Sequence, residues 1–152
     1  MTRIWEIVVC LFCFIPLFSC TGKRPSSLGP SDAGLSPCPS SPNCVTSDAT
    51  GVAHRVEPFA LSASPEYSWQ IIREAVAALP RTTVVKETAN YLHAECTSAL
   101  FGFVDDLELH LRPSDNMVTI RSASRLGYSD LGVNRRRVEE LRDVLRTRGV
   151  VR

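Results

Sequence analysis

The strongest constraint on the fold is a strict alternation of side chains in two neighbouring runs, 101–111 and 118–124. In the first run one parity is mostly apolar, and the other carries Asp106, Glu108 and His110. A period of two is typical of β-strands that bury one face. The two runs flank a short segment containing a proline, so they predict a pair of antiparallel strands on one hydrophobic core.

The pattern also predicts the register of this pair. Asp105 shares the parity of the apolar residues and is therefore expected to point inward, where it needs a partner. On the outer face Glu108 should lie opposite Arg121, a favourable cross-strand ion pair. A slip of one residue would set apolar against polar side chains throughout. The predicted inward pairs are Leu111 with Val118, Leu109 with Ile120, Leu107 with Ser122, and Asp105 with Ser124.

Two helices and a second hairpin complete the prediction. Ser64 followed by proline and glutamate is typical of a helix start, and Pro80 should end that helix. The runs 82–87 and 91–97 are rich in β-formers and indicate a hairpin. A last helix should begin between residues 130 and 134, end near 146, and bury a stripe of Leu131, Val138, Leu141 and Leu145.

This order of elements predicts a single small α+β domain. We expect an antiparallel sheet of about four to five strands with two helices packed on one face. The segment 45–61 is expected to be irregular or to form short strands. The domain itself is expected to span residues 38–152, and its length allows no second domain.

The N-terminus indicates export. Residues 7–18 form a nearly unbroken apolar run behind Arg3, which is shorter than the roughly 20 residues that span a bilayer. The run ends in Leu-Phe-Ser-Cys20, which resembles a bacterial lipobox. We therefore expect residues 1–19 to be a lipoprotein signal peptide and Cys20 to carry the fatty acids that anchor the chain. An uncleaved membrane anchor is the alternative.

Residues 20–37 are rich in serine, proline and glycine, and predict a flexible tether between the anchor and the domain. Thr21 follows the cysteine, where an aspartate would favour retention in an inner membrane. By analogy with that sorting rule, the outer membrane facing the periplasm is the favoured location.

Three cysteines lie beyond Cys20. Cys38 and Cys44 enclose a short loop that suits a disulfide in an oxidising compartment. Half of a metal site is the alternative, but no second ligand pair follows at zinc-like spacing. Alternation places Cys96 on the apolar face of its strand, which indicates an inert buried thiol.

The stretch 121–137 is the densest polar part of the chain, with five arginines and three serines. It indicates either an internally paired network, in which Asp105 and Asp106 hold the loop 125–137 onto the sheet, or a site for a small anionic ligand or a lipid headgroup. The candidate residues for such a site are Asp105, Asp106, Arg121, Ser124, Arg125, Tyr128, Asp130, Asn134, Arg135 and Arg136.

Other function classes have weaker support. The net charge is only +1, and the arginine-rich residues 135–152 contain no aromatic side chain for base stacking, so we expect no nucleic-acid partner. Serines and histidines are present, but no Gly-x-Ser-x-Gly motif supports a hydrolase. His93 and Glu95 share a strand face without a third ligand, so a solvated face, with no metal or cofactor, is expected.

Several motifs together resemble the family catalogued as domain of unknown function 1499, over roughly Pro37 to Leu145. They are the Cys38–Cys44 loop, Tyr91-Leu-His-Ala-Glu95, Phe101-Gly-Phe-Val-Asp-Asp106, Arg121-Ser-Ala-Ser-Arg125 and Gly127-Tyr-Ser-Asp-Leu-Gly-Val-Asn-Arg-Arg-Arg137. The resemblance implies an exported module of bacterial envelopes or plastids and supplies no catalytic residues. Cys96-Thr97 departs from the family pattern.

The sequence therefore favours a membrane-anchored envelope lipoprotein that acts as a non-catalytic structural or protein-interaction module, with another envelope protein as its partner. A binding module for a small anion and a hydrolase remain as alternatives.

Overall fold

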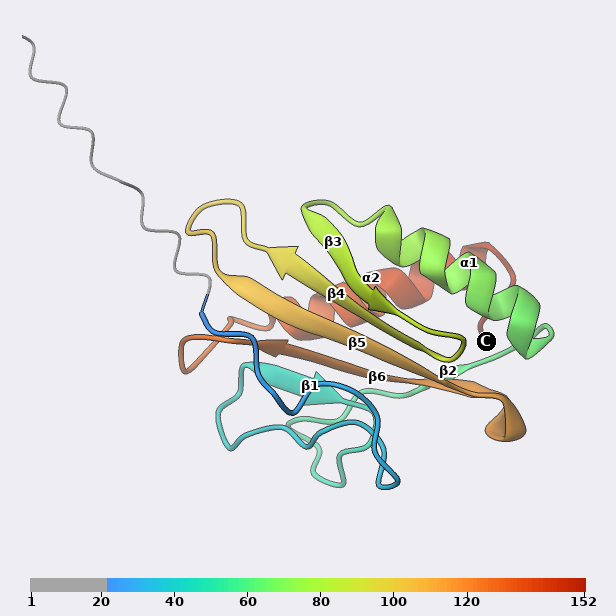
Figure 1. Ribbon diagram of the computed structural model, residues 1–152, viewed down its shortest axis with the longest axis horizontal. Helices are drawn as coiled ribbons and strands as arrows, with labels where there is room; N and C mark the ends of the chain where they lie inside the picture. Colours follow the sequence, from blue (N-terminus) through green and yellow to red (C-terminus); the bar gives the residue numbers. More distant parts are fainter. Residues whose placement is uncertain (1–21) are drawn as a thin grey trace, which may run out of the picture.

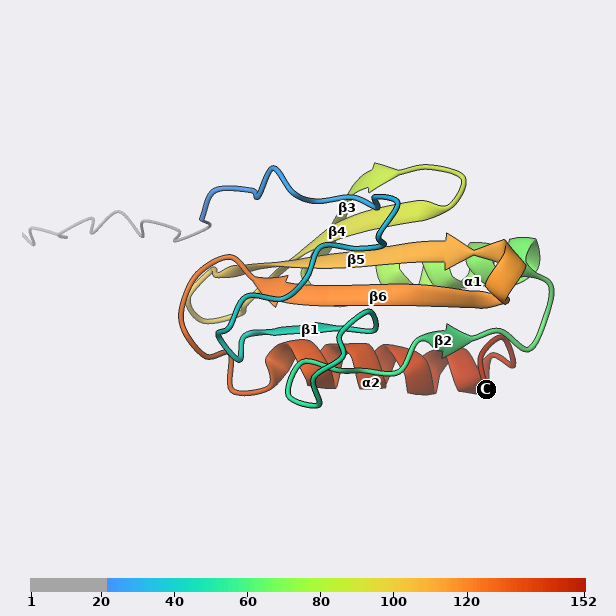
Figure 2. The ribbon, with the colours of Figure 1, turned by 90° about the horizontal axis from the view of Figure 1, so that it is seen from below.

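The computed structural model describes residues 22–152 and shows one antiparallel sheet with two helices on one of its faces (Figures 1 and 2). The strand order is β1-β6-β5-β4-β3, and β2 also pairs with β6. The predicted α+β architecture is confirmed. The elements are β1 (Cys44–Thr46), β2 (Phe59–Ala60), α1 (Pro65–Ala77), β3 (Thr82–Glu87), β4 (Tyr91–Thr97), β5 (Val104–Arg112), a 3-10 turn (Pro113–Asp115), β6 (Met117–Ser124) and α2 (Val133–Thr147).

The predicted signal peptide, residues 1–19, and the lipidation site Cys20 lie outside the described residues. Within residues 22–152, neither helix has the length and apolar character needed to cross a membrane.

The central hairpin has the predicted register. Asp105 lies opposite Ser124, Glu108 lies opposite Arg121, and the other three predicted pairs are also observed. The segment between the strands reverses direction at Asn116, which adopts the left-handed backbone conformation with φ of 50°. Strand alternation was therefore sufficient to place the side chains of β5 and β6 on the correct faces.

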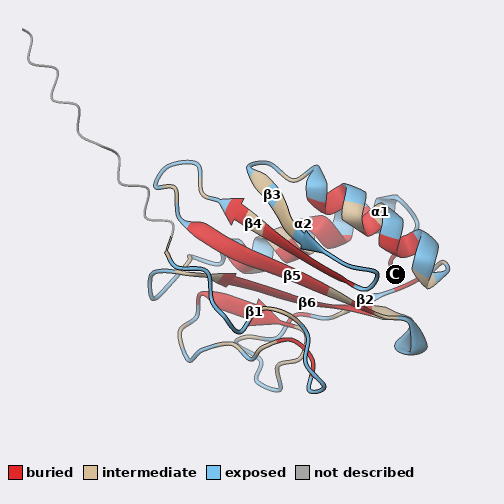
Figure 3. Ribbon diagram, viewed as in Figure 1, coloured by how far each residue is buried: buried red, intermediate tan, exposed pale blue. Residues whose placement is uncertain are grey.

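Helix α1 also begins where the sequence predicts. The Ser64 side chain accepts a hydrogen bond from the backbone N–H of Tyr67, and Pro65 occupies the first turn. Trp69, Ile72 and Val76 are buried along one helical face. They pack with residues of α2 and the inner sheet face into a single core, and Figure 3 shows buried residues in red along the central strands and on both helices.

Two predictions about which apolar side chains are buried are wrong. Strand β5 begins at Val104, so Phe101 and Phe103 lie in the preceding loop and are 65% and 40% exposed. The loop closes because Ser98 binds Phe103 across it: the Phe103 N–H donates to Ser98 Oγ at 3.0 Å, and the Ser98 N–H donates to the Phe103 carbonyl at 2.8 Å. Leu131 precedes α2 in a left-handed turn (φ 54°) and is exposed, so it does not belong to the helical stripe.

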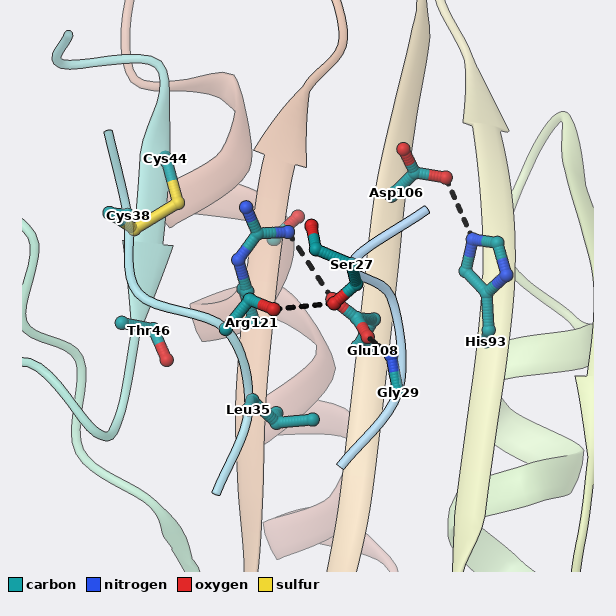
Figure 4. Close-up of polar contacts among 12 residues, drawn as sticks. Ser27, Gly29, Leu35, Cys38, Cys44, Thr46, His93, Asp106, Glu108 and Arg121 are labelled. Atoms are coloured by element: carbon teal, nitrogen blue, oxygen red, sulfur yellow. Dashed lines mark hydrogen bonds and ion pairs between the residues drawn. A yellow bond between two sulfur atoms is a disulfide. The ribbon is translucent and has the colours of Figure 1, made fainter. Parts of the chain in front are cut away.

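Residues 22–36, here called the N-terminal strap, run across the outer face of the sheet, where the sequence predicted a flexible tether (Figure 4). Leu35 is buried, and its backbone N–H bonds Asp48 Oδ2 at 3.2 Å. The backbone N–H of Gly29 donates to Glu108 Oε1 at 2.7 Å. The strap has few apolar side chains, but its backbone donors satisfy acceptors on a charged sheet face, which composition alone does not reveal.

Candidate functional site

The outer face of the sheet carries a connected group of polar side chains, here called the outer network. The outward positions of three adjacent strands, β4, β5 and β6, and the residue that follows β6 bring it together. The strap and the loop that precedes β1 lie over this part of the sheet (Figure 4). The network consists of Tyr91, His93, Glu95, Asp106, Glu108, Arg121 and Arg125.

Glu108 is the centre of one half of the outer network. Its carboxylate is fully buried and accepts hydrogen bonds from Tyr91 Oη at 2.8 Å, from Gly29 N at 2.7 Å and from Arg121 Nη1 at 3.2 Å. Burial, together with the neighbouring Glu108, raises the pKa of the Tyr91 hydroxyl well above its ordinary value. The tyrosine therefore stays protonated and acts as a donor to the carboxylate.

Asp106 is the centre of the other half. Arg125 binds it in a bidentate manner, with Nε to Oδ2 at 2.9 Å and Nη2 to Oδ1 at 2.7 Å, and the same Nη2 also contacts Glu95. His93 Nε2 lies 2.7 Å from Asp106 Oδ1. Arg24 of the strap reaches Glu95 from above, with Nε at 2.8 Å.

The pKa shifts follow these contacts. Burial would raise the pKa of Asp106, but hydrogen bonds from Arg125 and His93 outweigh it and hold the pKa below its ordinary value. The pKa of Glu95 is likewise lowered, because its bonds to Arg125 and Arg24 outweigh burial. The bond to Asp106 raises the pKa of Arg125. The carboxylates and the guanidinium of this half of the network are therefore ionised at neutral pH.

The structure corrects the expectation of a solvated face at His93 and Glu95. His93 is buried, and Asp106 adds a third potential metal ligand, with the three ligand atoms within 4.8 Å of one another. The Arg125 guanidinium already bonds both carboxylates of this trio. Its charge lies where a metal ion would have to bind, so the arrangement suits an ion-pair cluster better than a metal centre.

A second polar group, here called the inner network, lies on the opposite face of the sheet beside the start of α2. Arg137 Nη2 bonds Asp105 Oδ2 at 2.7 Å, and its Nη1 bonds Asn134 Oδ1 at 2.7 Å. The buried Asn134 also donates to Ser124 Oγ at 3.0 Å and accepts from Ser122 Oγ at 2.5 Å. Asp105 thus has the inward arginine partner that its parity requires.

The remaining candidate residues surround the beginning of α2. Asp130 accepts hydrogen bonds from the backbone N–H groups of Gly132 and Asn134, at 3.0 and 2.7 Å, and so caps the helix. Arg135 donates to two backbone carbonyls of the loop after β1, and Arg136 donates to the carbonyl of Leu131. Tyr128 is exposed and belongs to neither network.

The ten candidates therefore do not converge on one site. Asp106, Arg121 and Arg125 belong to the outer network, whereas Asp105, Ser124 and Asn134 belong to the inner one. The predicted outer pair of Glu108 with Arg121 is part of the outer network, but sequence reasoning missed Arg137 and the contributions of Tyr91, His93 and Glu95. The register of β4 against β5, which pairs His93 with Glu108 and Glu95 with Asp106, would have identified two of them.

A cavity lies beside Arg137 of the inner network. It has a volume of about 320 Å³ and is lined by the start of α2, the end of β4 and the turn before β3, including Arg81, Ser98 and Arg136.

In residues 22–152 no serine hydroxyl forms a hydrogen bond with a histidine, so the pair that a serine hydrolase would use is not assembled there.

The Cys38–Cys44 disulfide is present, which confirms that prediction. Cys96 is free and buried on the inner face of β4, and burial raises the pKa of its thiol. This thiol is therefore not activated as a nucleophile.

Fold and networks together define a small α+β domain whose charged side chains are paired mainly with one another on both faces of one sheet. The chain belongs to the family described as protein of unknown function DUF1499, whose model matches residues 34–145. This confirms the resemblance. No curated protein and no solved structure matches the chain.

Proposed function

We propose that this protein is an exported lipoprotein, anchored through Cys20, whose domain is a non-catalytic structural or protein-interaction module in the cell envelope. The favoured location is the outer membrane, facing the periplasm, with another envelope protein as the partner. No nucleic acid, metal or cofactor forms part of this proposal.

One observation carries the non-catalytic part. All five arginines of the stretch 121–137 have acceptors within the chain: Arg121 on Glu108, Arg125 on Asp106, Arg135 and Arg136 on backbone carbonyls, and Arg137 on Asp105. Binding a ligand with Arg121, Arg125 or Arg137 would leave a buried carboxylate without its arginine partner, which is costly. Such a network favours holding the fold together over exchanging ligands.

The lipobox-like sequence before Cys20 supports the anchor. The disulfide supports an oxidising compartment outside the cytoplasm, since disulfides are rare in the cytosol of most organisms. Metabolic labelling with a radioactive fatty acid tests the proposal directly. The wild-type chain should be labelled and should sediment with membranes, whereas the Cys20→Ser chain should carry no label.

Cys96→Ser is the matched control, because it also removes one cysteine but leaves the lipobox intact. It should be labelled like the wild type. An unlabelled wild-type chain, or a Cys20→Ser chain that keeps the label, would refute the lipid anchor.

The cavity beside α2 favours a second candidate function, a binding site for a small anion. Arg81 and Arg136 line it, and Arg136 is exposed and bonded only to a backbone carbonyl among the described residues. Native mass spectrometry of the protein purified from its host tests this. A bound anion that is lost in Arg136→Ala would favour the binding module, and a bare chain in both proteins would favour the structural one.

A further inference from the structure

The exposed apolar side chains are concentrated at one end of the domain. Seven of the ten large hydrophobic residues that are exposed in the described chain lie in two segments, the loop before β5 and the residues from the end of β6 into the start of α2. Scattered exposed hydrophobics are normal, but a concentration of this kind marks a contact surface. The set, here called the apolar end, is Leu100, Phe101, Phe103, Leu126, Tyr128, Leu131 and Val133.

The two segments are neighbours in space. They leave adjacent strands at the same end of the sheet, where Ser124 pairs with Asp105 and Arg125 N donates to Val104 O at 3.1 Å. Figures 1 and 2 show both loops at the left end of the molecule, away from the turn between β5 and β6. The apolar residues therefore belong to one end of the domain rather than to two separate patches.

The strap begins at this end. A Cβ atom at Gly22 would lie 2.9 Å from Arg125 Cβ and 3.1 Å from Leu126 Cγ, so the first described residue lies directly against the second loop. Cys20 is two residues earlier in the chain. Two residues span at most about 7 Å, so a lipid attached to Cys20 would hold the apolar end next to the headgroup layer.

We infer that the apolar end is a membrane-contacting surface, inserted into the interface of the same bilayer that holds the anchor. This inference rests on the lipid anchor proposed above. Tyrosine and aliphatic side chains on a polar domain suit the boundary between headgroups and acyl chains. Two exposed cations suit the anionic headgroups: Lys23, which follows Gly22 of the strap, and Arg136, three residues after Val133.

The membrane explains the apolar end better than a protein partner does, because the short link to Cys20 leaves little room for a second protein between this end and the bilayer. The outer network helps to place the apolar end at the bilayer. By holding the strap against the sheet, it fixes which end of the domain the anchor leaves from.

Tryptophan quenching by brominated lipids tests the inference with three aromatic-for-aromatic variants. Phe101→Trp and Tyr128→Trp report on the two loops of the apolar end. Tyr67→Trp is the matched control, because Tyr67 is 55% exposed at the start of α1, which follows β2 at the opposite end of the sheet. The full lipidated chains are inserted into vesicles of phosphatidylethanolamine and phosphatidylglycerol with brominated acyl chains, and the wild-type signal is subtracted.

The tryptophans of Phe101→Trp and Tyr128→Trp should be quenched several-fold more strongly than that of Tyr67→Trp. Equal, weak quenching at all three positions in chains that carry the fatty-acid label and stay on the vesicles would overturn the inference while leaving the anchor intact. A blue shift in the emission of the Phe101→Trp variant only on addition of envelope proteins would assign the surface to a protein partner and would also overturn it. Failure of the anchor itself is read beforehand, from the missing label.

Discussion

The two faces of one sheet carry polar networks of the same chemistry but of different origin. The inner network joins β5 and β6 to α2, which the chain reaches directly after β6. The outer network pairs residues of β4, β5 and β6 and is completed by the strap, whose Gly29 lies 79 positions from Glu108. Alternation therefore decides which face a side chain occupies, whereas burial depends on what covers that face.

Removing Arg125 should have the largest effect on this comparison. Arg125→Ala leaves the buried Asp106 with His93 as its remaining side-chain partner among the described residues, and leaves Glu95 with Arg24 alone. We expect the free energy of unfolding to fall by about 3–5 kcal/mol, because a buried charge loses its partner. Urea denaturation with the disulfide intact measures it.

Arg136→Ala is the matched control, since it removes an exposed arginine whose acceptor is a backbone carbonyl. The change there should stay within about 0.5 kcal/mol. Similar small losses of unfolding free energy in both variants would show that the Arg125 ion pairs contribute little to stability.

Asn134→Ala probes the inner network and should have the next largest effect. The side chain is fully buried, and its loss leaves Ser122, Ser124 and Arg137 each short of one hydrogen-bond partner. A loss of about 1–3 kcal/mol is expected, less than for Arg125 because no charge loses its only counterion. Should Asn134→Ala destabilise more than Arg125→Ala in the same urea titration, the ranking of the two networks would be reversed.

The features that the sequence predicts are those set by near neighbours, and the features it does not predict depend on distant segments. The inward position of Asp105, the pair Glu108–Arg121 and the start of α1 at Ser64 were all predictable, because each depends on alternation or on capping between near neighbours. The contact of the buried Glu108 with Gly29 was not, since it depends on a strap that composition assigns to a flexible tether. Phe101 and Phe103 continue the strand alternation, and only the closure of their loop removes them from it.

Acid should weaken the outer network by a smaller amount. Because the folded pKa values of Asp106 and Glu95 are lowered, the unfolded chain binds more protons than the folded one, and stability rises with pH. This contribution to stability is fully present above the pKa values of the unfolded chain, near about 4. It is lost as the pH falls through the lower pKa values of the folded protein. Unfolding midpoints measured between neutral pH and pH of about 3 should therefore drop on acidification.

The same titration in Arg125→Ala should be flatter, because the Arg125 hydrogen bonds that contribute most to lowering both pKa values are gone. Asn134→Ala should keep the wild-type slope, since it leaves the outer carboxylates with their partners. Parallel curves for wild type and Arg125→Ala would argue against Arg125 as the source of the pH dependence.

Amide hydrogen exchange at Gly29 distinguishes a strap that is docked on the outer network from one that is free as a tether. Its N–H donates to the fully buried Glu108 carboxylate, so exchange should be much slower than in an unstructured peptide and should accelerate in Glu108→Gln, where the charge is lost. Exchange at the free-peptide rate in the wild-type protein would contradict the docking of the strap.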